Sequence, residues 1–367
     1  MNFRMAGIKF LMAFAFLLVF VTPSSAQTKK PDVIAYYTGN DTVINAYSVK
    51  SLTHIIYSFL HLNGDTLAFG SDRQRQILKA LTDLKKQNPQ LKVMVALGGW
   101  GGCAPCSEVF SRDTSRAKFA ASVRRIMDNY NADGLDLDWE YPVIEGYPGH
   151  SRSLSDKDNF TDLIRKLRKS IGKGREISFA AGGFTPFVDS AIDWKAVMPL
   201  VDRVNLMSYD LVSGFSRVTG HHTPLYSNKD QKESGDNGVK LLMKAGVPAS
   251  KIVLGAAFYA RAWANVSADR NGIYQSGVFL DFVPYKILYS KYPDTDGYVT
   301  YTDPISKAIW RYSAEKKIFM TFDDPTSIKA KTEYCKKLKL GGIMFWELTL
   351  DKPEAGLLDV ITKTLEK

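Results

Sequence analysis

Three acidic residues, Asp136, Asp138 and Glu140, alternate with leucine and tryptophan in the segment GLDLDWE at 134–140. The pattern indicates a buried β-strand. Successive side chains of a strand point to opposite faces, so the three acids share one face and the apolar residues share the other. Neighbouring acids on that face have Cα atoms about 6.6 Å apart, which is twice the rise of about 3.3 Å per residue. The spacing therefore predicts a cluster of carboxyl groups on one side of the strand.

Carboxyl groups this close together cannot all be ionised at low energy in a confined site. At least one of them should hold a proton at neutral pH. Glu140 is at the C-terminal end of the predicted strand. We expect burial and neighbouring charge to raise its pKa, which suits a general acid. Asp138, in the middle, can share hydrogens with both neighbours, whereas Asp133 has the opposite parity and is predicted to be structural.

Two other interpretations of the acidic segment are a cation site and a solvated surface. A cation site would need histidines or further carboxylates converging on it. A surface strand would not alternate so strictly with leucine and tryptophan. We therefore predict that the acids are catalytic and that no metal is bound.

Short apolar strands alternate with longer amphipathic segments along the rest of the chain. Such an alternation indicates a parallel sheet that is covered by helices on both faces. Eight βα units over this length predict an α/β fold of the closed (β/α)₈ TIM barrel type, whose active sites lie at the carboxyl ends of the strands. An open doubly wound sheet would usually show a glycine-rich phosphate loop early in the chain, and none is seen. The strand candidates are 33–37, 54–60, 92–99, 134–140, 176–183, 203–209, 251–257 and 342–348.

One interval between the predicted strands is far too long for a single helix. Between the seventh and eighth strands, residues 323–342 supply the expected helix. Residues 259–322 remain, and they are rich in tyrosine and turn residues. We interpret them as a small α+β insertion within a single catalytic domain at 27–367.

The first 26 residues predict a signal peptide, because Arg4 and Lys9 precede an apolar run at 10–21 that is followed by small residues ending at Ala26. The alternative is an uncleaved anchor, but the 12-residue run is shorter than the ~20 residues that a bilayer span needs. We expect cleavage after Ala26, a secreted or periplasmic protein, and no membrane association after cleavage. Removing the signal peptide takes away the positive charges of Arg4 and Lys9 and changes the formal net charge from +10 to +8.

The basic residues and the cysteines carry no separate function in this interpretation. Lysine and arginine recur at helical spacing, which is typical of solvated helix faces, and no nucleic-acid partner is predicted. Cys103 and Cys106 form a C-x-x-C sequence without the helix context of a redox motif or the further ligands of a zinc site. A local disulfide between them is the preferred interpretation.

At DGLDLDWEYP the chain resembles glycoside hydrolase family 18, the family of chitinases and endo-β-N-acetylglucosaminidases. Its D-x-x-D-x-D-x-E signature is complete from Asp133 to Glu140. The segments MSYD at 207–210, FYARAW at 258–263 and GGIMFWEL at 341–348 resemble the family's sixth, seventh and eighth strands. The predicted insertion is similar to the α+β domain of many family members.

The resemblance implies a retaining mechanism in which the substrate's own N-acetyl carbonyl attacks the anomeric carbon and Glu140 protonates the glycosidic oxygen. Asp138 would orient the acetamido N–H, Tyr209 would hydrogen-bond the acetamido oxygen, and Asp136 would share the proton of Asp138. The mechanism needs no cofactor.

The resemblance also implies a saccharide groove. Sugar rings present apolar C–H faces, for which flat aromatic side chains are suitable platforms. Trp346 would be the floor under the sugar at the cleavage point. For any one aromatic residue, core packing is the alternative role. The residues implied in substrate binding are Tyr36, Phe59, Gly98, Gly99, Trp100, Gly101, Tyr141, Met207, Asp210, Tyr259, Arg261 and Trp346.

The third strand departs from the family pattern. It usually reads S-x-G-G, whereas here it reads ALGG, with Ala96 in the serine position. The missing hydroxyl would normally help to stabilise Asp136. We expect Tyr36 to be the remaining partner, with a shifted pH optimum or a slower turnover as the consequence.

The sequence therefore predicts a secreted, monomeric chitinase that acts on chitin or chito-oligosaccharides by cleaving β-1,4 bonds between N-acetylglucosamine units. One alternative is an endo-β-N-acetylglucosaminidase acting on the chitobiose core of N-glycans. Another is a non-catalytic chitin-binding lectin, although such relatives typically lack the acid that is present here as Glu140.

Overall fold

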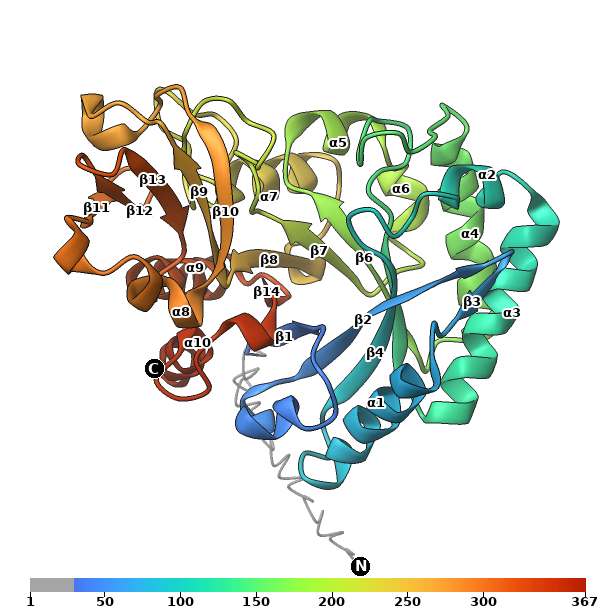
Figure 1. Ribbon diagram of the computed structural model, residues 1–367. Coiled ribbons are helices and arrows are strands. Elements are labelled where there is room, and N and C mark those ends of the chain that lie inside the picture. The colour runs from blue at the N-terminus through green and yellow to red at the C-terminus, as the bar shows by residue number, and fades with distance from the viewer. Residues whose placement is uncertain (1–29) are drawn as a thin grey trace, which may run out of the picture.

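The computed structural model of the protein describes residues 30–367 (Figure 1). The predicted signal peptide lies outside the described residues. Within 30–367, no helix combines the length and the apolar character that a bilayer crossing requires.

Eight parallel strands form a closed barrel, so the predicted (β/α)₈ fold is confirmed (Figure 1). The first strand pairs with both the second and the last, which closes the sheet. A short strand, β3 (Thr66–Ala68), extends β2 as an antiparallel hairpin. In their order around the barrel the strands are β1 (Asp32–Tyr37), β2 (His54–Asn63), β4 (Lys92–Gly98), β5 (Gly134–Asp138), β6 (Glu176–Gly182), β7 (Arg203–Met207), β8 (Ile252–Ala257) and β14 (Gly342–Trp346).

Helices surround the barrel, and side chains cap several of their N-termini. Ser71 and Ser234 accept hydrogen bonds from backbone N–H groups of the first turn, and Asp324 forms a capping box with Ser327. The helices outside the second sheet are α1 (Asp72–Asp83), α2 (Cys106–Phe110), α3 (Asp113–Tyr130), α4 (Asp156–Ile171), α5 (Thr185–Ser190), α6 (Trp194–Val197), α7 (Gly235–Lys244), α9 (Pro325–Leu338) and α10 (Leu357–Glu366).

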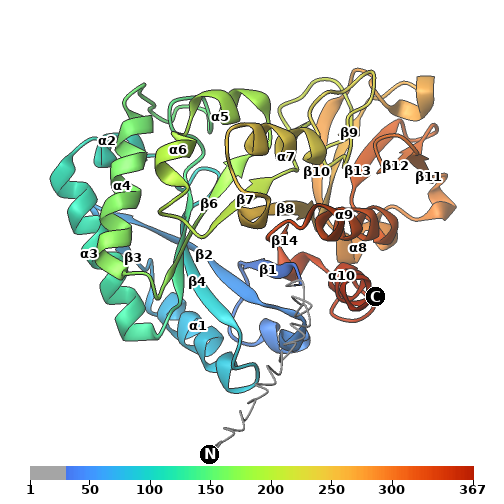
Figure 2. The same ribbon diagram turned by 180° about the vertical axis from the view of Figure 1, so that it is seen from behind.

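A second, antiparallel sheet follows β8 after the single residue Phe258 and lies beside the barrel (Figures 1 and 2). It falls within the segment 259–322, which the sequence predicts to be an insertion. In spatial order its strands are β10 (Val278–Pro284), β9 (Tyr259–Ala264), β13 (Ile318–Phe322), β12 (Ala308–Ser313) and β11 (Val299–Asp303), and α8 (Tyr285–Lys291) follows β10.

The alternation in β5 divides its side chains between two environments. Leu135 and Leu137 are buried in the core between the barrel and the helices, where Trp139, just past the strand, packs against Phe110 and Phe160. The opposite side chains face the barrel interior. β5 ends at Asp138, two residues earlier than the sequence predicts. Only two of the three acids are therefore on the strand.

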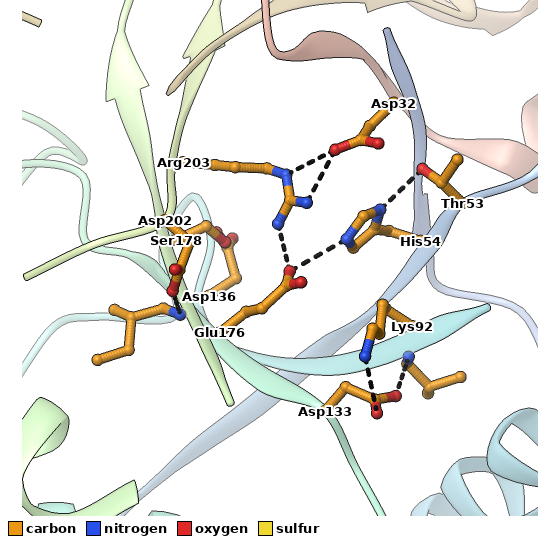
Figure 3. Close-up of polar contacts among 12 residues, drawn as sticks. Asp32, Thr53, His54, Lys92, Asp133, Asp136, Glu176, Ser178, Asp202 and Arg203 are labelled. Carbon is orange, nitrogen blue, oxygen red and sulfur yellow. Dashed lines mark hydrogen bonds and ion pairs between the residues drawn. The ribbon is translucent and has the colours of Figure 1, made fainter. Parts of the chain in front are cut away.

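The amino ends of the strands are joined by charged side chains inside the barrel (Figure 3). Arg203 on β7 donates to Asp32 on β1 over 2.8 and 3.2 Å and also pairs with Glu176 on β6. His54 on β2 lies 3.1 Å from the same Glu176 carboxylate. Asp133 accepts a hydrogen bond of 2.7 Å from the backbone N–H of the β4 residue Val93, which agrees with its predicted structural role. These contacts connect strands from different sides of the barrel.

We predict that the stabilisation by Glu176 disappears in acid. Burial alone would raise the pKa of Glu176, but the hydrogen bond with His54 and the charge of Arg203 lower it from 4.5 to about 2. Because the pKa is depressed, the contribution is complete above pH 4.5 and is lost as the pH falls towards 2. Relative to wild type, Glu176→Gln should lose about 2–3 kcal/mol of unfolding free energy at pH 7.

Urea unfolding between pH 7 and pH 3 measures this difference, which should shrink as the pH falls. Glu315→Gln is the control, because Glu315 is 77% exposed and pairs only with Lys316 at the surface. A difference between wild type and Glu176→Gln that stays constant over this pH range would contradict the prediction.

Candidate active site

Asp136 is held at the centre of the barrel by donors from three strands. Tyr36 on β1 donates to Oδ2 over 2.8 Å, and Ser178 on β6 and Asn205 on β7 donate to Oδ1 over 2.6 and 3.0 Å. Burial raises the pKa of Asp136 to about 6, while these three hydrogen bonds act in the opposite direction. Asp136 is thus a fully buried carboxyl whose ionised form is stabilised by three hydrogen bonds.

Ser178 corrects the expectation drawn from Ala96. In the sheet register Asp136 pairs with Ala96 of β4 on one side and with Ser178 of β6 on the other. The hydroxyl that is missing from β4 is therefore supplied from β6, and Tyr36 is not the sole remaining partner. The shifted pH optimum or slower turnover expected from Ala96 remains a prediction. Only the barrel register could have drawn attention to the serine in EISFAAGG.

Asp138 is also buried, but its environment is less favourable for a charge. Its Oδ1 has no hydrogen-bond partner among residues 30–367. Burial, followed by the charges of Glu140 and Asp136, raises its pKa well above the usual range. Asp138 therefore favours the protonated state, and within the described residues its buried Oδ1 has no hydrogen-bond partner.

Glu140 lies two residues beyond the end of β5, half-buried at the mouth of the barrel. Burial raises its pKa to about 7; hydrogen bonding with Tyr141 lowers it, and the charge of Asp210 raises it. The peptide bond between Glu140 and Tyr141 is cis. A carboxyl group with this pKa, beside a cavity, can give and take a proton near neutral pH.

Tyr209 is placed beside the acids by the loop that follows β7. The strand ends at Met207, so Tyr209 is not on it as the sequence predicts. Its hydroxyl has one weak contact, 3.8 Å from Sδ of Met344. Burial and the charges of nearby acids, Asp138 first among them, raise its pKa well above 10. The hydroxyl remains protonated and can donate a hydrogen bond.

A cavity of about 560 Å³ opens above these groups. It has the size of a ligand site and is lined mainly by aromatic side chains with a few polar groups. Most of the site residues predicted from the sequence line it, namely Phe59, Trp100, Asp138, Glu140, Tyr141, Met207, Tyr209, Asp210, Tyr259, Arg261 and Trp346. The predicted residues outside its lining are Tyr36, Gly98, Gly99, Gly101 and Asp136.

The floor of the cavity is aromatic. Trp346, at the end of β14, stacks on Phe59 with ring centroids 5.5 Å apart and planes 18° apart. Tyr36 lies beneath Trp346 at 5.7 Å and is buried, so it supports the floor and does not line the cavity.

Gly98 and Gly99 are required by close packing. Gly98 has a φ of +110°, and a Cβ there would lie 2.1 Å from the carbonyl oxygen of Asp138. A Cβ on Gly99 would lie 2.3 Å from the ring of Phe59. The glycines thus let the end of β4 approach β5 and the aromatic floor.

One wall of the cavity carries a fixed ion pair. Arg261 on β9 donates to both oxygens of Asp210 over 2.8 and 2.6 Å. Burial alone would raise the pKa of Asp210, but Arg261 and then His222 hold it well below its usual range. The guanidinium also lies 5.3 Å from the ring centre of Tyr259. The wall therefore presents an ionised carboxylate beside aromatic rings.

Several lining residues were not predicted from the sequence. They are in loops beyond the strand ends or on β10, where no motif marks them. Phe184 directly follows the strand ending AAGG, and Phe215 follows MSYD by a few residues, so aromatic residues just beyond strand ends were the available signal. The unpredicted residues are Glu145, Phe184, Ser213, Gly214, Phe215, Phe279 and Phe282.

The loop after β4 is shaped by a disulfide that joins Cys103 to Cys106 at the start of α2. Within residues 30–367 no group of three or more potential metal ligands is found. The chemistry available to the site is proton transfer by Glu140, which lies near the protonated carboxyl of Asp138. The aromatic floor of the cavity is suited to a sugar ring.

The sequence matches the family described as "Glycosyl hydrolases family 18" over residues 32–351. Chitinase A1 of Niallia circulans is 33% identical over 303 residues, which cover 75% of this chain and 43% of that protein. The chain thus spans less than half the length of that relative. Chitotriosidase-1 of Mus musculus is 32% identical over 326 residues, which cover 82% of this chain and 67% of that protein.

A solved structure with a similar fold is that of a family 18 N-acetylglucosaminidase from Paenibacillus barengoltzii. Its TM-score is 0.83 at 35% identity, and the alignment covers 92% of this chain and 100% of that one.

We predict that Ser178→Ala raises the pKa of Asp136 by about one unit, because the ionised carboxylate loses one of its three hydrogen bonds. Titration of the Asp136 carboxyl carbon by ¹³C NMR measures the change. Ser122→Ala is the control, since Ser122 is equally buried but bonds only to the backbone of Phe119 and Leu67.

Ala96→Ser extends this test. Alone it should change the titration little, but in the Ser178→Ala background it should move the pKa back towards the wild-type value. An Asp136 titration that is identical in wild type and Ser178→Ala would show that the β6 hydroxyl has no such role.

Proposed function

Because the chain belongs to the glycosyl hydrolases of family 18, we propose that it is a secreted chitinase that cleaves β-1,4 bonds between N-acetylglucosamine units. The observation that carries the proposal is the position of Glu140. This carboxyl has a pKa of about 7 and lines a cavity with an aromatic floor, next to the buried Asp138.

In the proposed mechanism Glu140 gives its proton to the glycosidic oxygen while the bond from that oxygen to the anomeric carbon breaks. The carbonyl oxygen of the substrate's own acetamido group forms the new bond to the anomeric carbon, which yields an oxazolinium ion. Water then adds to the anomeric carbon from the face that the leaving sugar occupied, the bond from that carbon to the acetamido oxygen breaks, and the Glu140 carboxylate takes a proton from the water. Two inversions give net retention.

Asp138 and Tyr209 are the proposed partners of the acetamido group. Asp138 lines the cavity, so its carboxyl group can accept a hydrogen bond from the acetamido N–H. The Tyr209 hydroxyl is protonated and has only its weak contact with Met344, so it can donate to the acetamido oxygen. Both contacts would orient the carbonyl for attack. Asp136, ionised among its three donors, would take up part of the proton of Asp138 in this step.

The aromatic lining supports binding of a saccharide. Trp346 would lie under the sugar at the cleavage point, and Trp100 and Tyr141 would contact the neighbouring unit. Polar groups of the same cavity, among them the hydrogen-bonded pair Asp210 and Arg261, would bind sugar hydroxyls.

Secretion and a monomeric state complete the proposal. The sequence at 1–26 supports export with cleavage after Ala26, and the Cys103–Cys106 disulfide is compatible with an oxidising compartment. The alternatives of an N-glycan endoglycosidase and a non-catalytic lectin are not favoured, since Chitinase A1 and Chitotriosidase-1 are among the similar curated proteins and the acid is present.

The pH dependence follows from Glu140. A raised pKa means that the proton-donating form is present below about pH 7 and is lost above it. We expect kcat on chitotetraose to fall by about tenfold per pH unit above the pKa. Steady-state rates from pH 5 to pH 9 measure this limb, and a kcat that is constant up to pH 9 would contradict the assignment.

Hydrolysis of a chromogenic chitobioside tests the function itself. Glu140→Gln, which cannot donate the proton, should lower kcat by roughly 10²–10⁴-fold, whereas the surface control Glu315→Gln should retain it. Fully deacetylated chitosan should resist cleavage, because it lacks the attacking carbonyl, and fresh products from chitotetraose should be β-anomers by NMR. Rapid cleavage of chitosan or fresh α-anomers would refute the substrate-assisted mechanism.

A further inference from the structure

The loop that carries Glu140 is held by a buried carboxylate that the proposed mechanism does not use. Asp156, the first residue of α4, is fully buried. Its Oδ2 accepts hydrogen bonds from the backbone N–H groups of Ser153 over 2.8 Å and of Val143 over 3.4 Å. Its own N–H donates to the carbonyl oxygen of Ser153 over 3.0 Å. Asp156 thus connects residues near both ends of the loop at 139–155.

The same carboxylate is also bound by α2. The hydroxyl of Ser107 donates to Asp156, with Oδ1 at 2.8 Å and Oδ2 at 3.0 Å. Ser107 is buried as well, and it directly follows Cys106 of the disulfide in the loop after β4. α2 and α4 are neighbours outside the barrel (Figures 1 and 2). Asp156 therefore links the loop after β5 to a helix whose start is restrained by the disulfide.

The backbone of the loop depends on such restraints. Val143 has a φ of +70°, in the left-handed region, where a β-branched residue is rarely found. A conformation of this kind persists only where the surroundings fix it, and the hydrogen bond to Asp156 is one such restraint. The loop also packs closely on Glu140, because a Cβ added to Gly146 would lie 2.0 Å from the Glu140 carbonyl oxygen. A rearrangement at Val143 would therefore be transmitted to Glu140, three residues earlier.

We propose that Asp156 is a positioning residue that keeps the side chain of Glu140 in the cavity. Asp156 acts through the loop, because it is not among the residues that line the cavity. Ser107 contributes by fixing the carboxylate. The inference rests on the proposed function in so far as Glu140 is the proton donor, but the environment of Glu140 can be measured without a substrate.

A loosened loop should affect proton donation more than sugar binding, since most of the cavity lining is on other elements. A Glu140 side chain that spends time in water also loses part of the effect of burial, so its pKa should fall from about 7 towards 4.5. The other titratable groups around it are Asp138, Tyr141, Tyr209 and Asp210. None of them is substituted in the test, so the Glu140 titration reports its position.

Asp156→Ala removes every hydrogen bond of the carboxylate. We expect kcat on a chromogenic chitobioside to fall by about 10–100-fold while KM changes little, because a small displacement of the acid weakens catalysis strongly. The alkaline limb of the kcat profile and the ¹³C NMR titration of the Glu140 carboxyl should both move to lower pH by about one unit.

Two milder variants separate positioning from folding. Ser107→Ala leaves Asp156 and its contacts with the loop backbone in place, so it should fold, and it should lower kcat by about three- to tenfold. Asp156→Asn can still accept from the loop N–H groups through its amide oxygen and donate to Ser107 through its amide nitrogen. It should therefore retain most of the wild-type kcat and the wild-type titration of Glu140.

Asp162→Ala is the matched control on the same helix. Asp162 pairs with Arg116 over 2.7 Å and so joins α4 to α3 instead of to the loop. This variant should unfold at a lower urea concentration than wild type, but its kcat and its Glu140 titration should be unchanged.

The positioning role is overturned if Ser107→Ala, and Asp156→Ala where it folds, keep the kcat and the Glu140 titration of wild type. It is also overturned if Asp162→Ala changes both to the same extent. If wild type hydrolyses neither the chitobioside nor chitotetraose, the proposed function fails instead, and the Glu140 titration alone decides the positioning role.

Discussion

The need to hold three carboxyl groups close together in a buried site governs the carboxyl end of this barrel. Burial and mutual repulsion both disfavour ionisation, so each group needs a different environment. Asp136 receives three hydrogen bonds and can carry charge in the interior. Asp138 receives none at Oδ1 and favours its proton. Glu140, beyond the strand end, is left with a pKa near neutrality and faces the cavity.

The amino end of the same barrel contains buried charges that are paired with charges of opposite sign. There the buried charges are of both signs, and Arg203 lies between Asp32 and Glu176 (Figure 3). Each carboxylate at this end has a cationic or hydrogen-bonding partner, so the network joins strands and needs no proton exchange. In this fold the amino ends of the strands serve stability and the carboxyl ends carry the active site. Paired charges at the amino end and crowded like charges at the carboxyl end agree with that division.

The second sheet completes the cavity as well as lying beside the barrel. It contributes Tyr259 and Arg261 from β9 and two phenylalanines from β10 to the lining. Its junction with the barrel is fixed by Asp323, which accepts from the backbone N–H of Ala257 over 2.9 Å and pairs with the fully buried Lys331 on α9 over 2.6 Å. Removing one partner of such a pair would leave an uncompensated buried charge, so the sheet is held in a defined position relative to β8.

The amino-acid sequence by itself determined the features that depend on local periodicity. The two-residue repeat of β5 decides which side chains face the barrel axis, and the repeated strand and helix patterns predict the barrel. The clustering of the carboxyl groups follows from the same repeat, whereas the site role of Trp346 was implied only by the resemblance to the family.

Only the tertiary structure decided the contacts that depend on strand register and loop packing. Ser178 compensates for Ala96 because β4 and β6 flank β5, and no pattern in either segment reveals that both strands reach Asp136. The meeting of Trp100 with Phe215 joins loops more than a hundred residues apart in the chain. Such partners are brought together by closure of the barrel, which is a property of all eight strands together and of none of them separately.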